Sequence, residues 1–293
     1  MNPVYVISDT EGEGKTAVCA GLARKIQESG ASVAVFKPLA GEGLSPDSDR
    51  DADTYHALLG QQRGPSPLEL SGAGLTDALI DDIKAAFTTV SDGMDIVLVE
   101  GACALSTEES AKLAAVLDAR SLVVTLHRRG LTGSGLGHWK ELFGDRLVGF
   151  VVNGMTRYLG TETRAELLPS MESEGLRCFG TVPEDRRLLG VSVRQLAQHL
   201  EGRFVVCEEQ SDALVEYLMV GGMGMDPVEL YFGTRENKAI IVRGDRPDIQ
   251  MGALNTETSC MVLTKGIEPI EYVRYEAEQE EVSVMIVETD TLS

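Results

Sequence analysis

Residues 8–16, with the sequence Ser-Asp-Thr-Glu-Gly-Glu-Gly-Lys-Thr, combine two glycines, a lysine and a threonine in an order suited to binding phosphate. Glycines allow a tight turn, so unpaired N–H groups at a helix N-terminus can face an anion. The Lys15 ammonium would contact the β- and γ-phosphates of a nucleotide, and the Thr16 hydroxyl would bind Mg²⁺. The segment therefore predicts a phosphate-binding P-loop. The residues expected to contact the nucleotide are Thr10, Glu11, Gly12, Glu13, Gly14, Lys15 and Thr16.

The loop departs from the usual spacing G-x-x-x-x-G-K-[ST], which asks for glycine where this chain has Asp9. The nearest small residue is Ser8, one position further out, which gives a loop one residue longer. A Gly-Lys-Thr sequence can also arise by chance at a strand-to-helix turn. A β-branched and aromatic run before the loop and an apolar stripe over residues 17–29 after it favour the phosphate site.

Three more polar residues stand where apolar strands are predicted to end: Lys37, Glu100 and Asn153. The carboxyl ends of parallel strands meet at one edge of a sheet, which is where ligands bind in open α/β folds. Lys37 suits the charge that develops on a moving phosphoryl group, so Lys15 and Lys37 are the candidate catalytic residues. Glu100 is placed like a carboxylate that holds Mg²⁺, and the Asn153 amide suits the edge of a base.

Each of these residues also has a structural interpretation. Glu100 would cap a neighbouring helix, Lys37 would be solvated, and Asn153 would bridge loop backbones. Asp51 and Asp53 follow Lys37 in a polar loop, and either could supply a second carboxylate to the metal. For each of these two acids, a solvated position or a helix N-cap remains an equal alternative.

Apolar strands alternate with amphipathic helices over the first part of the chain, which predicts an α/β fold with a parallel sheet covered on both faces. The same alternation restarts on a smaller scale, so we expect domains at residues 1–203 and 204–293. Residues 130–137 are expected to form a glycine-rich loop and residues 213–220 a helix. Residues 221–224 follow no clear strand, so we interpret them as a turn.

Composition narrows the function. The chain has 293 residues, 43% of them hydrophobic, and a net charge of −20, which disfavours nucleic acid and anionic membranes as partners. No signal peptide is evident, and no apolar run reaches the length of about 18 residues that spans a bilayer.

The five cysteines lack C-x-x-C spacing, which favours reduced thiols in the cytoplasm. The four histidines lack ligand spacing, and Cys103 is expected to be a small buried thiol.

The four chemical segments, taken in order, resemble dethiobiotin synthetase. They are residues 8–16, 37–38, 100–102 and 151–153. The resemblance implies a P-loop fold that binds ATP and Mg²⁺, with Lys15 on the phosphates and Lys37 facing the transferred phosphoryl group. It further implies that Asn153 faces adenine, and that the Mg²⁺ ligands are Thr16, Glu100 and Asp53, or Asp51 in its place.

The second half is similar to the DRTGG domain, through residues 244–250 and 264–266, with Lys265 where glycine is typical. This arrangement resembles the N-terminal region of long phosphotransacetylases. Residues 1–293 contain no acetyltransferase domain, so no acetyl transfer is expected of them.

Three positions depart from the dethiobiotin synthetase pattern: Ser8 replaces a glycine, Gly41 replaces a serine that would contact the substrate, and Cys103-Ala104 replaces a glycine pair. Two hypotheses follow. One is a nucleotide-sensing module that is regulated or self-associates through its second domain, as a homo-oligomer. The other is an ATP-dependent ligase or phosphoryl transferase acting on a small carboxylate or carbamate. The departures favour the sensor. The absence of G-x-G-x-x-G at the first turn disfavours a dinucleotide-dependent oxidoreductase.

Overall fold

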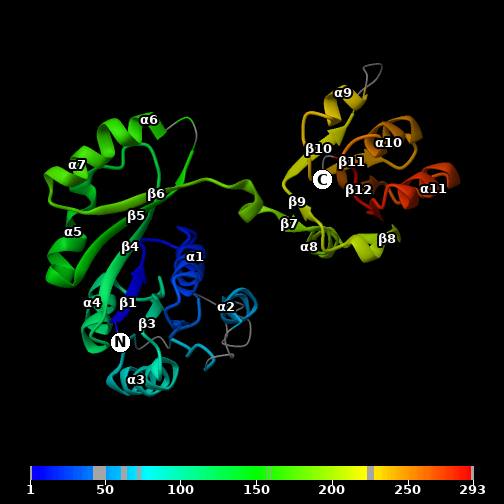
Figure 1. Cartoon of the computed structure of the whole chain (residues 1–293). Helices are drawn as coiled ribbons and strands as arrows, with labels where there is room; N and C mark the ends of the chain where they lie inside the picture. Colours follow the sequence, from blue (N-terminus) through cyan, green and yellow to red (C-terminus); the bar gives the residue numbers. More distant parts are fainter. Residues whose placement is uncertain are drawn as a thin grey trace. The chain divides into compact units, whose positions relative to one another are not determined.

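The computed structural model describes residues 2–41, 51–60, 65–70, 74–156, 158, 160–222 and 228–291. It contains two compact units, Met1–Glu184 and Asp185–Ser293 (Figure 1). The division falls earlier in the chain than the predicted boundary between residues 203 and 204. Val193 and Ala197 explain the difference, because both pack with Ala239 and Cys260 in a core cluster of the second unit.

Within its described residues, the first unit contains a six-stranded parallel sheet in the order β2-β3-β1-β4-β5-β6. Its strands are β1 (Asn2–Ile7), β2 (Val33–Phe36), β3 (Ile96–Glu100), β4 (Arg120–Leu126), β5 (Leu147–Met155) and β6 (Cys178–Pro183). The order puts β1 at the centre, between β3 and β4. The predicted parallel α/β sheet is confirmed.

Helices cover both faces of this sheet (Figure 1). They are α1 (Lys15–Glu28), α2 (Asp51–Leu59), α3 (Asp77–Ser91), α4 (Thr107–Val116), α5 (Gly133–Phe143), α6 (Gly160–Glu162), a π-helical turn (Thr163–Leu167) and α7 (Leu168–Ser173), with a 3₁₀ turn at Gly144–Arg146. Alternate residues of β1 enter different cores: Val6 packs with α1 and α2, whereas Tyr5 and Ile7 pack with α3, α4, α5 and α7. Burial on both faces explains why the inner strands β1, β3 and β4 are largely apolar.

The expected glycine-rich loop at residues 130–137 is wrong in its second half, because α5 begins at Gly133. Thr132 caps this helix by accepting a hydrogen bond from the Gly135 N–H at 3.3 Å. A Cβ at Gly133 would collide with the carbonyl of Ser170, so this glycine permits close packing of α5 on α7. Glycine marked a close helix contact here rather than a loop.

The second unit has its own five-stranded sheet among its described residues, in the order β10-β11-β12-β13-β8. The pairs are parallel except β13 with β8, which is antiparallel. The strands are β8 (Arg203–Val206), β10 (Tyr217–Gly221), β11 (Lys238–Arg243), β12 (Thr258–Thr264) and β13 (Ser283–Ile286), and β7 (Val191–Ser192) pairs separately with β9 (Leu214–Val215). The helices are α8 (Val193–His199), α9 (Val228–Phe232), α10 (Pro247–Leu254) and α11 (Glu271–Gln279), with 3₁₀ turns at Arg186–Leu189 and Glu208–Gln210.

Two predictions for this unit are wrong. The helix predicted over residues 213–220 is in fact β9 and β10, because Met219 joins the sheet core while Leu218 points outward, the alternation of a strand. Residues 221–224 do follow a strand, since Gly221 ends β10. Of that stretch, Met223 and Gly224 lie outside the described residues.

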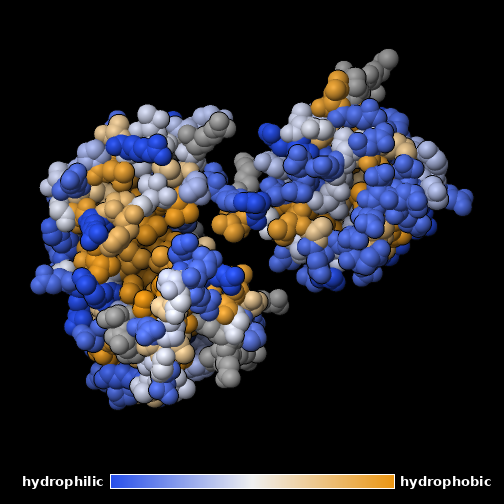
Figure 2. Space-filling model, viewed as in Figure 1, coloured by the Kyte–Doolittle hydropathy of each residue, from blue (hydrophilic) through white to orange (hydrophobic). Residues whose placement is uncertain are grey.

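Apolar side chains also gather on one face of the first unit (Figure 2). The edge strand β6 contributes to the exposed apolar surface, with Phe179 51% and Val182 38% exposed. No helix within the described ranges is long and apolar enough to cross a membrane.

Candidate functional site

The sheet order brings the predicted site residues to one edge of the first unit. The P-loop follows β1, Glu100 ends the neighbouring strand β3, and Lys37 follows β2 on the far side of β3. Gly101 donates its N–H to the Val6 carbonyl at 2.8 Å, which fixes the end of β3 against β1. All of these strands are parallel, so their carboxyl ends form one ligand-binding edge.

The P-loop backbone depends on glycine at two positions. Gly12 and Gly14 have φ angles of 76° and 92°, in the left-handed region that side chains disfavour. Asn153 donates its side-chain N–H to the Glu13 carbonyl at 2.8 Å, and a Cβ on Gly14 would collide with that amide. Asn153 therefore bridges to the loop backbone, which was the structural alternative for this residue.

The helix that follows the loop leaves its N-terminus open to an anion. Helix α1 begins at Lys15, has no acidic residue in its first turn and receives no side-chain cap from Gly14. Its first N–H groups have no helical acceptors, and the positive end of the helix dipole lies there. Both features favour a phosphate group.

The Lys15 amine donates to the Ser8 hydroxyl at 2.8 Å and to the Cys103 sulfur at 2.7 Å. Ser8 in turn donates to the Thr10 carbonyl at 2.7 Å. Cys103 is partly exposed, so the expectation of a buried thiol is wrong. Two of the three departures from the dethiobiotin synthetase pattern, Ser8 and Cys103, therefore meet on the P-loop lysine.

Thr16 and Glu100 lie next to each other. The Thr16 hydroxyl donates to Oε1 of Glu100 at 2.7 Å, and the Tyr55 hydroxyl donates to Oε2. Glu100 is 3% exposed, and burial raises the pKa of its carboxyl, while hydrogen bonds from Tyr55 and Thr16 oppose that rise. A hydroxyl and a carboxylate are the hard oxygen ligands that Mg²⁺ prefers, so these residues fit that ion.

Lys37 is paired with Asp51, the first residue of α2, and its side chain is only 9% exposed. Asp53 lies in the same first helical turn but its side chain is exposed. Of the two alternative acids, Asp51 is thus the one in contact with Lys37. Within the described residues, no three His, Cys, Asp or Glu side chains gather as a metal site. Mg²⁺ commonly takes one or two carboxylates and completes its shell with water and substrate phosphates.

Two acidic side chains of the loop lie near basic residues, one from the segment after β4 and one from α5. Asp9 lies 3.4 Å from His138, and Glu13 lies 4.0 Å from Arg128. Glu13 is 2% exposed, and its pKa is raised by burial first and then by Asp9. Thr10 donates to Glu13 at 3.2 Å, whereas Glu11 is exposed.

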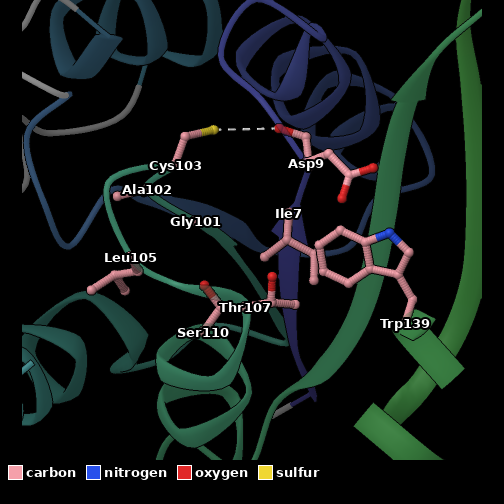
Figure 3. A pocket seen from close by; sticks show the side chains of 10 residues that line it. Ile7, Asp9, Gly101, Ala102, Cys103, Leu105, Thr107, Ser110 and Trp139 are labelled. Atoms are coloured by element: carbon pink, nitrogen blue, oxygen red, sulfur yellow. Dashed lines mark hydrogen bonds between the residues drawn. The ribbon is translucent and has the colours of Figure 1, made fainter. Parts of the chain in front are cut away.

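A small cavity of about 30 Å³ adjoins the loop, with room for about two water molecules. Figure 3 shows Cys103 and Trp139 on different sides of it, with Ile7 beside the indole ring. The dashed line in the figure joins the Cys103 sulfur to the Ser8 hydroxyl, 3.5 Å away.

The sequence interpretation missed Tyr55 at this edge. Tyr55 gave no signal because it lies inside an amphipathic helix, and its partner Glu100 is 45 positions away in the sequence.

Comparison with known proteins agrees with this division of the chain. A family model described as an AAA domain matches residues 2–191, and one described as a DRTGG domain matches residues 195–293. The ATP-dependent dethiobiotin synthetase of Streptomyces coelicolor is 32% identical over 200 residues, which cover 62% of this chain and 84% of that protein. The corresponding enzyme of Rhodococcus jostii is 32% identical over 205 residues, covering 62% of this chain and 87% of the enzyme.

A longer match runs through both units. The phosphate acetyltransferase of Synechocystis is 23% identical over 282 residues, which are 88% of this chain. This chain spans only 40% of that relative's length. The predicted family resemblance is confirmed: the chain belongs to the AAA-domain family of P-loop proteins that includes dethiobiotin synthetase, and this domain is followed by a DRTGG domain.

Proposed function

We propose that the first unit binds ATP together with Mg²⁺ and acts as a nucleotide-sensing module. The observation that carries the proposal is the contact of Thr16 with Glu100. The hydroxyl of Thr16, the residue after the P-loop lysine, lies 2.7 Å from Oε1 of Glu100. The pair would hold Mg²⁺, and Lys15 with the first turn of α1 would hold the phosphates. Bound Mg²⁺ would neutralise part of the phosphate charge.

The remaining roles follow the same edge. Asp51 or Asp53 would add a carboxylate near the metal, and the contact of Asp51 with Lys37 favours Asp51. Asn153 would face adenine with the part of its amide that does not bind the loop. Asp9 lies near His138 and Glu13 near Arg128, which lessens the repulsion of a nucleotide by these two acids.

Sensing rather than synthesis is supported by the contacts of Lys15. Its amine is hydrogen-bonded by Ser8 and Cys103, so a phosphate group would have to replace those contacts. Gly41 supplies no hydroxyl for a carbamate substrate, and the Cys103 side chain lies against Lys15 where the dethiobiotin synthetase pattern has glycine. The second unit would then transmit the nucleotide state through regulation or assembly of a homo-oligomer.

A second candidate function is an ATP-dependent ligase or phosphoryl transferase for a small carboxylate or carbamate. It is favoured by Lys37, a largely buried cation at the edge that also bears Lys15. Two cations at this edge would stabilise charge on a transferred phosphoryl group. The identity of 32% with dethiobiotin synthetases supports the same candidate.

One set of measurements separates the two functions. Calorimetry of the full chain with Mg-ATP measures binding, and release of ADP with a panel of carboxylates and amines measures turnover. The sensor predicts binding without turnover, and an oligomer population in sedimentation that changes with nucleotide. ADP release that Lys15→Ala abolishes would support the ligase instead. A monomer that ignores nucleotide in sedimentation would contradict the sensor.

A further inference from the structure

Helix α2 reaches two strand ends through one face. Asp51 and Tyr55 are four residues apart, so their side chains project from the same side of the helix. Asp51 accepts a hydrogen bond from Lys37 at the end of β2, and Tyr55 donates to Glu100 at the end of β3. The far end of α2 is tied to α1, since the side chain of Gln27 donates to the Leu59 carbonyl at 3.0 Å.

Tyr55 occupies a constrained position. It is 3% exposed and its ring packs in the core cluster that contains Cys19 and Leu59. This packing sets the location of the ring independently of the hydroxyl. The hydroxyl donates a hydrogen bond to Oε2 of Glu100 and also contacts the Cys19 thiol, which has no place in the phosphate or metal site.

The two oxygens of Glu100 thus have different donors. Oε1 accepts from Thr16 at 2.7 Å, and Oε2 accepts from Tyr55. A buried carboxylate is costly unless donors compensate it, and a carboxylate held at one oxygen only can rotate about its terminal bond. Hydrogen bonds behind a metal-binding carboxylate orient it and strengthen metal binding.

We propose that Tyr55 is a positioning residue of this site: its hydroxyl holds one oxygen of Glu100, so that the other stays beside the Thr16 hydroxyl and the pair is ready to hold Mg²⁺. The inference rests on the proposed binding of Mg-ATP. It assigns a role to helix α2 that is separate from metal ligation by Asp51 or Asp53.

The test compares the ATP affinity of the full chain in Mg²⁺ with its affinity in EDTA, by calorimetry, for wild type and Tyr55→Phe. The phenylalanine keeps the ring packing and removes the hydroxyl. We expect the ratio of the two affinities to fall about tenfold or more, with the EDTA affinity within about twofold of wild type. Tyr5→Phe is the matched control, because its buried hydroxyl lies beside Ser110 rather than beside Glu100, and it should leave the ratio unchanged.

A double variant sharpens the result. In the Glu100→Gln background, Tyr55→Phe should cause no further change in the ratio, because the carboxylate that it positions is gone. If Tyr55→Phe does not fold, Tyr55→Met removes the hydroxyl with a smaller but flexible apolar side chain that can adapt to the site, and it is expected to give the same ratio. If Tyr55→Phe leaves the ratio unchanged, or lowers the ATP affinity equally in Mg²⁺ and in EDTA, the inference about Tyr55 is wrong while the proposed function stands. Wild type without any Mg²⁺-dependent binding would overturn the proposed function and the inference together.

Discussion

The amine of Lys15 lies 2.7 Å from the sulfur of Cys103, a residue that follows the end of the neighbouring strand β3. The Ser8 hydroxyl lies 2.8 Å from the same amine. These two contacts hold the Lys15 amine at the end of β1. They place a competitor for phosphate at two of the positions where this chain departs from the dethiobiotin synthetase pattern, Ser8 and Cys103.

Replacing Cys103 with glycine should raise the affinity for ATP. The variant removes one partner of Lys15 from the nucleotide-free protein, and a hydrogen bond contributes about 0.5–1.5 kcal/mol, so the expected gain is roughly two- to tenfold. AMP, which lacks β- and γ-phosphates, should bind unchanged. Calorimetry with both nucleotides checks this. Cys103→Ser keeps a partner for the amine and serves as the control, and an equal effect on ATP and AMP would refute the competition.

Gly14 and Gly12 allow a matched comparison within the loop. Gly12→Ala has open space for its Cβ but a left-handed backbone, so it should cost about 1–2 kcal/mol. Gly14→Ala adds a collision with the Asn153 amide, so it should cost more and also weaken ATP binding. Urea unfolding followed by fluorescence reports on this unit, because the chain has a single tryptophan, Trp139, buried in α5. Equal costs for the two variants would contradict the contact with Asn153.

Glu109 should stabilise the first unit in a pH-dependent way. Its carboxylate accepts N–H hydrogen bonds from Leu75 and Ser106, each at 2.9 Å, and these lower its pKa. A carboxyl whose pKa falls on folding stabilises the fold above its unfolded pKa of about 4.3, and this stabilisation disappears as the pH falls through the folded pKa. Glu109→Gln should therefore cost only roughly 0.3–0.5 kcal/mol at neutral pH, because solvent screens the charge of this carboxylate and glutamine keeps an oxygen that can accept from the cap.

The same tryptophan fluorescence, followed in urea at neutral and acidic pH, measures this cost. The difference in free energy of unfolding between wild type and Glu109→Gln should become smaller at acidic pH. Glu108→Gln alters an exposed acid of the same helical turn and is expected to have little effect. A difference that stays constant across the pH range would show that the charge of Glu109 is not responsible.

Much of the first unit could be predicted because local patterns and fold agree there. The strand before Ser8, the glycines of the loop and the helix after Thr16 are consecutive in sequence and form one ligand-binding turn. Glu100 and Lys37 were predictable in position because each ends or follows a buried apolar strand.

Other features depend on contacts between distant residues. The apolar run of residues 213–220 has no periodicity that separates a helix from a strand, and pairing of β10 with β11 decided it. The contact of Lys15 with Cys103 joins residues 88 positions apart, and that of Tyr55 with Glu100 joins residues 45 positions apart. Neither leaves a local pattern, so both emerged only from the fold.

The most direct measurement is a calorimetric titration of the full chain with ATP and Mg²⁺, for wild type and Lys15→Ala. We expect wild type to bind one ATP per chain, with affinity that falls when EDTA removes Mg²⁺. We also expect Lys15→Ala, correctly folded by its tryptophan fluorescence, to lose most of that affinity. Wild type that binds no ATP, or a Lys15→Ala variant that binds as tightly as wild type, would contradict the proposed nucleotide site.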